Sequence, residues 1–208
     1  LWQFITSTGK GYGLNKNWWV DERRDYIKST HSAANYLNDL YKEFNNWYLA
    51  LAAYNCGSAR VHKAVRRHNS KNYWELYSLP SQTRSYVPNM MAAIIISSNP
   101  NKYGFTMNPE KDFDWYDKKI NKSVKLKTIA KCASIDIKIL QQYNPELKQG
   151  MIPPLKENEN YILRMPTNIS SSFDSLFAII EVPKLDQVLF IDHKVKRGES
   201  LWLIARKY

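Results

Sequence analysis

Residues 47–57 read WYLALAAYNCG, a short apolar run that ends in a tyrosine, an asparagine and a glycine. The run is apolar nearly all round, so it predicts a helix at the centre of a domain. Asn55 and Gly57 are typical of a helix end, where glycine permits a tight turn. Tyr54 and Asn55 also offer an aromatic face and an amide, which together suit an acetamido sugar. Both interpretations, helix termination and ligand binding, stay open on these residues alone.

Helical patterns lie on both sides of this run. Apolar residues recur at helical spacing over residues 29–44, with Ser29 or Thr30 as the expected N-cap. After a left-handed C-cap at Gly57, Ser58 is expected to cap a helix over residues 59–67. Residues 1–108 are therefore expected to be predominantly helical.

A further helix is expected over residues 81–97, where Pro88 either kinks it or starts its second part. Beyond residue 108 the chain changes to short β-branched runs with many lysines. The pattern L-x-x-I-A-[K/R] occurs at residues 126–131 and again at 201–206, each time after a basic, strand-like stretch. Such repetition is typical of copies of one small module, but two matches of six residues also arise by chance between amphipathic helices, so both interpretations stay open at this point. The expected organisation is a helical domain over 1–108, a module over 113–168, a linker over 169–191 and the start of a second module over 192–208.

The composition indicates a folded chain with an anionic partner or a basic solvated surface. Its 208 residues are 13% aromatic, which argues against disorder, and the net charge is +11. No zinc-ligand spacing, aromatic RNA-binding strand or basic heptad supports nucleic acid as the partner. Cys56 and Cys132 lie in apolar helical patterns and are expected to be buried free thiols. The longest apolar run, Met90 to Ile96, is too short to cross a bilayer.

Four segments resemble, in order and spacing, the lytic transglycosylases with a lysozyme-like fold. Residues 1–4 (LWQF) resemble the family's G-[LI]-[MW]-Q segment, and residues 53–57 (AYNCG) resemble its A-Y-N-[AS]-G motif. Residues 83–88 (TRSYVP) resemble the E-T-x-x-Y-V segment, with Gln82 in place of the acid. Residues 17–25 resemble a stretch typical of membrane-bound members. The resemblance implies a mainly α lysozyme-like domain, N-terminally incomplete in this chain, followed by small α+β (βααβ) LysM-like modules.

The trailing modules resemble LysM units, which bind glycans that contain N-acetylglucosamine. Residues 193–208 resemble the start of such a unit, and residues 118–166 resemble a diverged copy. The diverged copy lacks a glycine where the later copy has Gly198, so glycan binding by this copy stays open, and a structural spacer is the alternative.

The resemblance implies a peptidoglycan lytic transglycosylase with no cofactor and no metal. One glutamate would protonate the bond between N-acetylmuramic acid and N-acetylglucosamine, then deprotonate the 6-hydroxyl to give a 1,6-anhydro end. In the family this glutamate precedes the first of the four segments, so no catalytic residue is expected within the chain, which alone is predicted to be inactive. Salt bridges are expected to keep the acids Asp21, Glu22 and Asp25 ionised.

The residues carried over to the substrate cleft are Gln3, Tyr54, Asn55 and Tyr86. The expected partner is the glycan strand of peptidoglycan and not nucleic acid, at an envelope location that is periplasmic or, through a lipid anchor outside this chain, at the outer membrane. Two alternatives stay open: a lysozyme-type hydrolase that shares the fold, and a wall-binding protein without catalysis.

Overall fold

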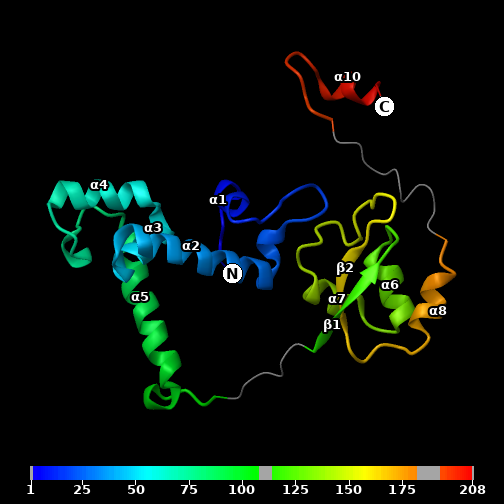
Figure 1. Ribbon diagram of the computed structural model, residues 1–208, viewed down its shortest axis with the longest axis horizontal. Helices are drawn as coiled ribbons and strands as arrows, with labels where there is room; N and C mark the ends of the chain where they lie inside the picture. Colours follow the sequence, from blue (N-terminus) through cyan, green and yellow to red (C-terminus); the bar gives the residue numbers. More distant parts are fainter. Residues whose placement is uncertain (1, 108–113, 182–192, 208) are drawn as a thin grey trace. The chain divides into compact units, whose positions relative to one another are not determined.

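A computed structural model describes residues 2–107, 114–181 and 193–207, which form two compact units (Figure 1). Unit 1 comprises Leu1–Asn17 and Asp21–Phe113, and unit 2 comprises Trp18–Val20 and Asp114–Tyr208. Each unit has its own hydrophobic core. The mainly α first part and the α+β second part agree with the fold class expected from the sequence.

Unit 1 is built around the helix that the opening run predicts. Helix α3 (Trp47–Cys56) packs against three others, and its residues 49–53 are buried. Figure 1 shows α2 and α5 running away from α3 in different directions. The helices of unit 1 are α1 (Thr6–Gly11), α2 (Tyr26–Phe44), α3, α4 (Ser58–His68) and α5 (Ser81–Ser98), with 3-10 turns at Glu22–Arg24, Tyr73–Glu75 and Pro100–Tyr103.

Two helix boundaries of unit 1 differ from the sequence expectation. Helix α2 begins at Tyr26, not near Ser29, because Asp25 caps it by accepting a 2.9 Å hydrogen bond from Lys28 N–H. Gly57 has φ 90° and ψ 141°, so it needs glycine but is not in the left-handed helical conformation that was expected. Ser58 does not cap α4, since its hydroxyl contacts Glu43 instead.

Helix α5 continues through Pro88 without a break. A proline has no N–H, so the Arg84 carbonyl loses the donor that a helix normally supplies four residues later. The hydroxyl of Tyr73 donates to this carbonyl at 3.0 Å and to that of Thr83 at 3.1 Å, which compensates for the loss. Within the described ranges, α5 and the other helices fall short of the length and apolarity that a membrane span requires.

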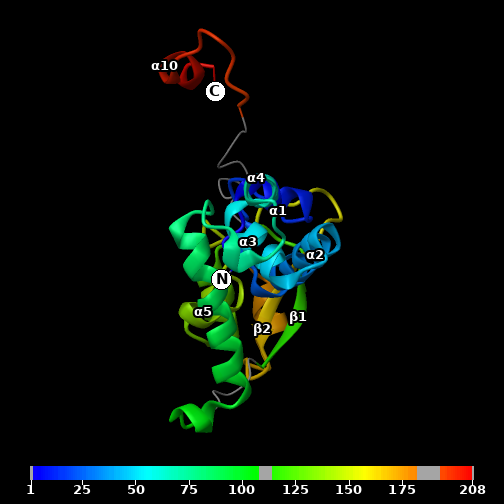
Figure 2. The ribbon, with the colours of Figure 1, turned by 90° about the vertical axis from the view of Figure 1, so that its left-hand side faces the viewer.

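Unit 2 has the expected βααβ order. Strand β1 (Trp115–Ile120) pairs antiparallel with β2 (Tyr161–Pro166), which lies beside it (Figure 2). The register runs from Trp115 opposite Pro166 to Ile120 opposite Tyr161. Helices α6 (Leu126–Ala133) and α7 (Ile137–Tyr143) lie between the strands in sequence.

Residues Trp18–Val20 contribute backbone contacts to unit 2, although they come early in the chain. Val20 forms an isolated antiparallel bridge with Leu147. The Lys148 N–H donates to the Trp19 carbonyl at 2.8 Å. Trp18–Val20 are therefore part of the structure of unit 2.

Helix α8 (Phe173–Ala178) lies where the sequence predicted a linker. Phe173 and Phe177 stack with ring centroids 5.4 Å apart and are buried in the core of unit 2. The Lys122 ammonium donates to the carbonyls of Phe177 and Ala178, at 3.2 and 2.9 Å, where the helix ends. For residues 173–178 the linker expectation is therefore corrected, because two aromatic side chains and a lysine cap hold them on the module.

The second repeat shows only its helix, α10 (Leu201–Ala205), capped by Ser200, whose hydroxyl accepts from Leu203 N–H at 3.3 Å. Residues 193–197 were expected to be strand-like, but no strand is assigned to them in the described range 193–207. A β-strand is defined by its ladder with a partner. In this repeat the amphipathic residues therefore form helix α10, whereas residues 193–197 pair with no strand in the described range.

Candidate functional site

Two adjoining cavities in unit 1 bring the four predicted site residues together. Their volumes are about 250 and 380 Å³, and both are lined by Trp2, Gln3, Tyr54 and Asn55. We call the two cavities together the cleft. The remaining lining residues are Phe4, Ile5, Thr8, Tyr36, Cys56 and Gly57 in the smaller cavity and Tyr86 and Met90 in the larger.

Gln3 is exposed at the cleft and has a left-handed backbone with φ 54°. This conformation is uncommon outside glycine and needs support from its surroundings. Both neighbouring carbonyls supply that support: Tyr54 Oη donates to Trp2 O at 2.8 Å, and Arg23 Nη1 donates to Phe4 O at 2.8 Å. The two hydrogen bonds on either side fix the backbone of Gln3, and Gln3 lines both cavities.

Arg23 is itself held by a carboxylate. Its Nε donates to Asp21 Oδ1 at 2.8 Å and its Nη2 donates to Asp21 Oδ2 at 2.6 Å, a bidentate arrangement. These hydrogen bonds from Arg23 lower the pKa of Asp21 below its usual value of 3.8. A side chain at position 9 would crowd the arginine, since a Cβ there would lie 3.1 Å from Arg23 Cδ. Asp21 is thus a structural anion, and it stays ionised as expected.

The tyrosines of the cleft are neutral. Burial raises the pKa of Tyr54 to about 12, with Tyr86 and Tyr36 adding to the shift, and burial also raises the pKa of Tyr86. The ring of Tyr54 packs against Tyr36 at 5.3 Å and edge-on to Phe4 at 6.3 Å between centroids. Tyr54 therefore shapes the cleft through its ring and holds the Gln3 segment through its hydroxyl.

Asn55 is half-buried at the carboxyl end of α3. Its Oδ1 accepts a 2.8 Å hydrogen bond from the hydroxyl of Thr83, in the first turn of α5. Its Nδ2 makes no hydrogen bond within the described part of the chain, and Asn55 lines both cavities. Beside it, burial raises the pKa of the Cys56 thiol, so Cys56 is a half-buried neutral thiol, while Cys132 is buried as expected.

No carboxylate of the described residues lines the cleft. Glu22 forms an ion pair of 2.5 Å with Lys28, and Asp25 caps α2. In the described ranges no three His, Cys, Asp or Glu side chains gather closely enough to hold a metal ion. The cleft therefore offers amides, hydroxyls and aromatic faces, which bind a neutral polar ligand by hydrogen bonding and stacking.

A larger cavity of about 660 Å³ lies elsewhere in unit 1, between α2, α3 and α5. Its lining is mostly apolar and includes Tyr41 and Trp47, whose rings stack at 4.5 Å. Its Asn46 already caps α3 through Oδ1, which accepts from Tyr48 N–H and Leu49 N–H. The sequence-predicted residues do not lie there.

Reasoning from the sequence missed the residues that hold the cleft in shape. Arg23 and Thr83 lie in two of the four segments that resemble the lytic transglycosylases. Nothing in the sequence marks either of them as a residue that supports the cleft. Tyr36 is one of several aromatic residues on α2, and only the fold shows that it contacts Tyr54. Trp2 could have been found, since it stands beside Gln3 in the same motif.

Comparison with known proteins assigns families to the three parts of the chain. Residues 1–77 match the Transglycosylase SLT domain, and residues 118–182 match the LysM-like domain of lytic transglycosylase MltD. Residues 193–208 match the LysM domain. The second match extends past residue 168 and takes in helix α8.

The whole chain is also similar to curated relatives. It is 37% identical over 222 aligned residues to the membrane-bound lytic murein transglycosylase D of Escherichia coli strain K12, and equally to that of E. coli O6:H1. The alignment covers 100% of this chain and 48% of each relative, so the chain spans about half the length of the relatives it matches. The chain thus has matches to an SLT domain, an MltD-type LysM-like domain and a LysM domain in that order, and over its whole length it is similar to membrane-bound lytic murein transglycosylase D.

Proposed function

We propose that the protein cleaves the β-1,4 bond between N-acetylmuramic acid and N-acetylglucosamine in peptidoglycan and leaves 1,6-anhydromuramic acid ends. The observation that carries this proposal is the convergence of Gln3, Tyr54, Asn55 and Tyr86 on one cleft in the SLT part of the chain. Amides recognise hydroxyl and acetamido groups, and tyrosine rings contact sugar faces.

The described residues act on the substrate by binding and orienting it. Tyr54 and Tyr86 are neutral and aromatic, and Asn55 lines the cleft with an amide nitrogen that has no partner among the described residues. Glycosidic cleavage also needs a carboxylic acid next to the leaving oxygen, and none lines the described cleft. We therefore propose that the 208 residues alone do not cleave, and that the acid is a glutamate of the full-length protein outside them.

The modules of unit 2 and residues 193–208 support a glycan strand as the partner, because they match LysM-type families. The curated relatives are described as membrane-bound. We propose a periplasmic or outer-membrane location for this protein, the latter through a lipid anchor that lies outside the 208 residues.

The test is digestion of purified sacculi by the full-length protein, with mass spectrometry of the products. Anhydro ends are expected, whereas reducing muramic acid ends would show a hydrolase of the lysozyme type. Products from neither reaction would favour the binding protein, which is the second candidate because no carboxylate of the described residues lines the cleft.

In the same assay, Asn55→Ala or Gln3→Ala is expected to slow turnover roughly tenfold, the effect of one lost hydrogen bond. Unchanged turnover in both variants would remove the cleft from the proposal.

A further inference from the structure

We propose that Thr83 is a positioning residue that makes Asn55 a hydrogen-bond donor toward an N-acetyl carbonyl oxygen in the cleft. The inference rests on the proposed function, since it takes the cleft to be the glycan site. It adds a direction to the binding: the amide of Asn55 gives a hydrogen bond to the substrate and does not receive one.

The direction follows from how the amide is shared. An asparagine amide presents a carbonyl acceptor on one side and an NH₂ donor on the other, and it can be turned either way in a symmetrical site. Here Thr83 Oγ1 donates to Asn55 Oδ1 at 2.8 Å. The acceptor is thereby occupied on the protein side, while Nδ2 has no partner among the described residues and Asn55 lines both cavities.

Burial makes this hydrogen bond selective. Thr83 is 1% exposed, so water does not compete for its hydroxyl. The hydroxyl also has a hydrogen-bond contact with the Cys56 thiol, but sulfur is a weak acceptor, so the amide oxygen of Asn55 at 2.8 Å is the preferred partner. Turning the amide over would break that hydrogen bond and force the hydroxyl to accept instead.

The backbone at Thr83 is held in place by Tyr73. Tyr73 is buried, and its hydroxyl donates to the carbonyls of Thr83 and Arg84 at 3.1 and 3.0 Å. The second of these carbonyls has no helical N–H partner, because Pro88 stands four residues later. The first turn of α5 is thus anchored at the point where it meets Asn55, and a fixed donor can hold the amide in one orientation.

The first experiment uses the 208-residue chain without ligand and reads the side-chain amide protons of Asn55 by NMR. We expect nuclear Overhauser contacts from these protons to Trp2 and Gln3, and none to the methyl group of Thr83. Contacts to the Thr83 methyl group would mean that the amide is reversed, and they would overturn the proposal whether or not the cleft binds glycan.

The second experiment titrates the same chain with chitotetraose, the N-acetylglucosamine tetramer, and follows the Trp2 indole N–H as the cleft signal. Thr83→Val keeps the shape but removes the hydroxyl, and it is expected to weaken cleft binding about fivefold to tenfold. Thr83→Ser keeps the hydroxyl and is expected to stay within about twofold of the wild type. In an Asn55→Ala background, Thr83→Val is expected to have no further effect, which a purely structural role for Thr83 would not produce.

The outcomes separate the two proposals. If chitotetraose moves no cleft signal in the wild type, the glycan site is wrong, while the free-state amide contacts still decide the orientation. If the wild type binds but Thr83→Val binds equally well, or weakens binding just as much without Asn55, Thr83 is not a positioning residue. Thermal unfolding of each variant shows whether it remains folded during the titration.

Discussion

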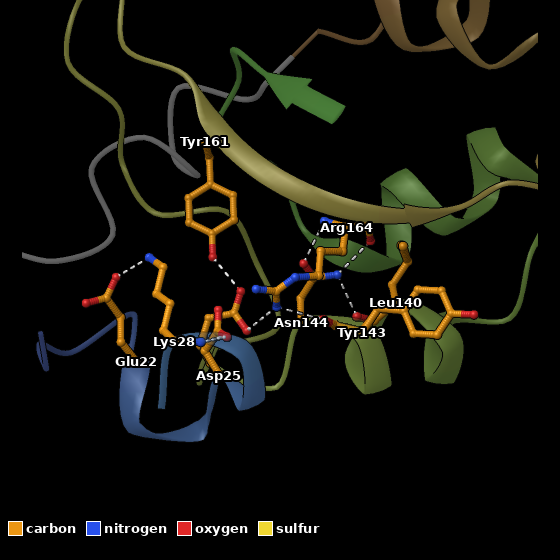
Figure 3. Close-up of polar contacts among 9 residues, drawn as sticks. Glu22, Asp25, Lys28, Leu140, Tyr143, Asn144, Tyr161 and Arg164 are labelled. Carbon is orange, nitrogen blue, oxygen red and sulfur yellow. Dashed lines mark hydrogen bonds and ion pairs between the residues drawn. The ribbon is translucent and has the colours of Figure 1, made fainter. Parts of the chain in front are cut away.

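Two asparagines, one in each unit, differ in how their amides are used. Asn144 in unit 2 is 1% exposed, and its Nδ2 donates to the carbonyls of Leu140 and Arg164, both at 2.9 Å. Its Oδ1 accepts from Arg164 N–H at 2.9 Å (Figure 3). Asn55 in unit 1 uses only Oδ1 within the described residues, and it lines the cleft.

This difference separates an asparagine that stabilises the fold from one that is available to bind a ligand. Buried polar groups are normally satisfied within the protein, as those of Asn144 are, and they contribute to the fold. Asn144 links the end of α7 to strand β2 and so closes the βααβ module. A half-buried amide with its donors directed into a cavity is satisfied by what enters that cavity. Asn144 is therefore a structural residue, and Asn55 is a candidate for binding.

The largest expected effect comes from Asn144→Ala. It removes three hydrogen bonds from the Asn144 side chain to the backbone of Leu140 and Arg164, so the unfolding free energy of unit 2 should fall by about 3 kcal/mol. Hydrogen exchange of the amides in the β1–β2 ladder measures this directly.

Asn55→Ala is the matched control for that experiment. It removes a single side-chain hydrogen bond, and the exchange of α3 amides should correspond to a loss of less than about 1 kcal/mol. Equal losses in the two variants would abolish the distinction between a structural and a binding asparagine.

An intermediate effect on stability is expected for Tyr73→Phe. Tyr73 holds the first turn of α5, which in turn holds Asn55, so this variant tests the support of the asparagine in unit 1. The variant keeps the ring in the core of unit 1 but deletes the hydroxyl that serves the carbonyls of Thr83 and Arg84. Unit 1 should lose about 1–2 kcal/mol of unfolding free energy, because the Arg84 carbonyl then lacks a donor. Denaturant unfolding followed by unit 1 signals provides the measurement, and exchange in the β1–β2 ladder should stay at the wild-type level.

The secondary structure was largely predictable because its signals are local. The apolar run of α3 and the two L-x-x-I-A helices α6 and α10 follow from periodicity alone. The first residue of α2 was harder to predict, because Asp25 and Ser29 are both residue types that cap helices well. In the folded protein Ser29 is buried within α2 and Asp25 is the cap. Helix α8 was missed because six residues carry too little periodicity, and its stability comes from Phe173 and Phe177 in the core of unit 2.

The four cleft residues were predictable only through the motifs they occupy. Nothing local indicates that Gln3 and Asn55, far apart in sequence, share a cavity, or that Arg23 holds a carbonyl next to Gln3. Such contacts depend on the tertiary packing of α2, α3 and α5, which a single sequence does not specify. Assigning residues to the cleft needed the resemblance, and explaining how they are held needed the structure.

The smallest expected effect concerns pH and distinguishes a buried ion pair in unit 1 from an exposed one in unit 2. Arg23 lowers the pKa of Asp21, so the folded state favours the carboxylate more than the unfolded chain does. The resulting stabilisation is fully present above the usual Asp pKa near 3.8 and is lost as pH falls through the lower folded value. Asp21→Asn should therefore cost on the order of 1 kcal/mol at pH 6, and the difference from the wild type should shrink toward pH 2.

Asp174→Asn is the matched change in unit 2. Asp174 pairs with Lys118 at 2.6 Å, but its side chain is 76% exposed, and exposed pairs contribute little because solvent screens them. Thermal unfolding from pH 2 to 6 should show a pH-dependent difference for Asp21→Asn, whereas Asp174→Asn should unfold close to the wild type at pH 6. The Trp2 indole signal should shift only in Asp21→Asn, since Arg23 then holds the Phe4 carbonyl less firmly and the Gln3 segment loosens. A constant difference across this pH range would mean that Asp21 acts through packing and not through its charge.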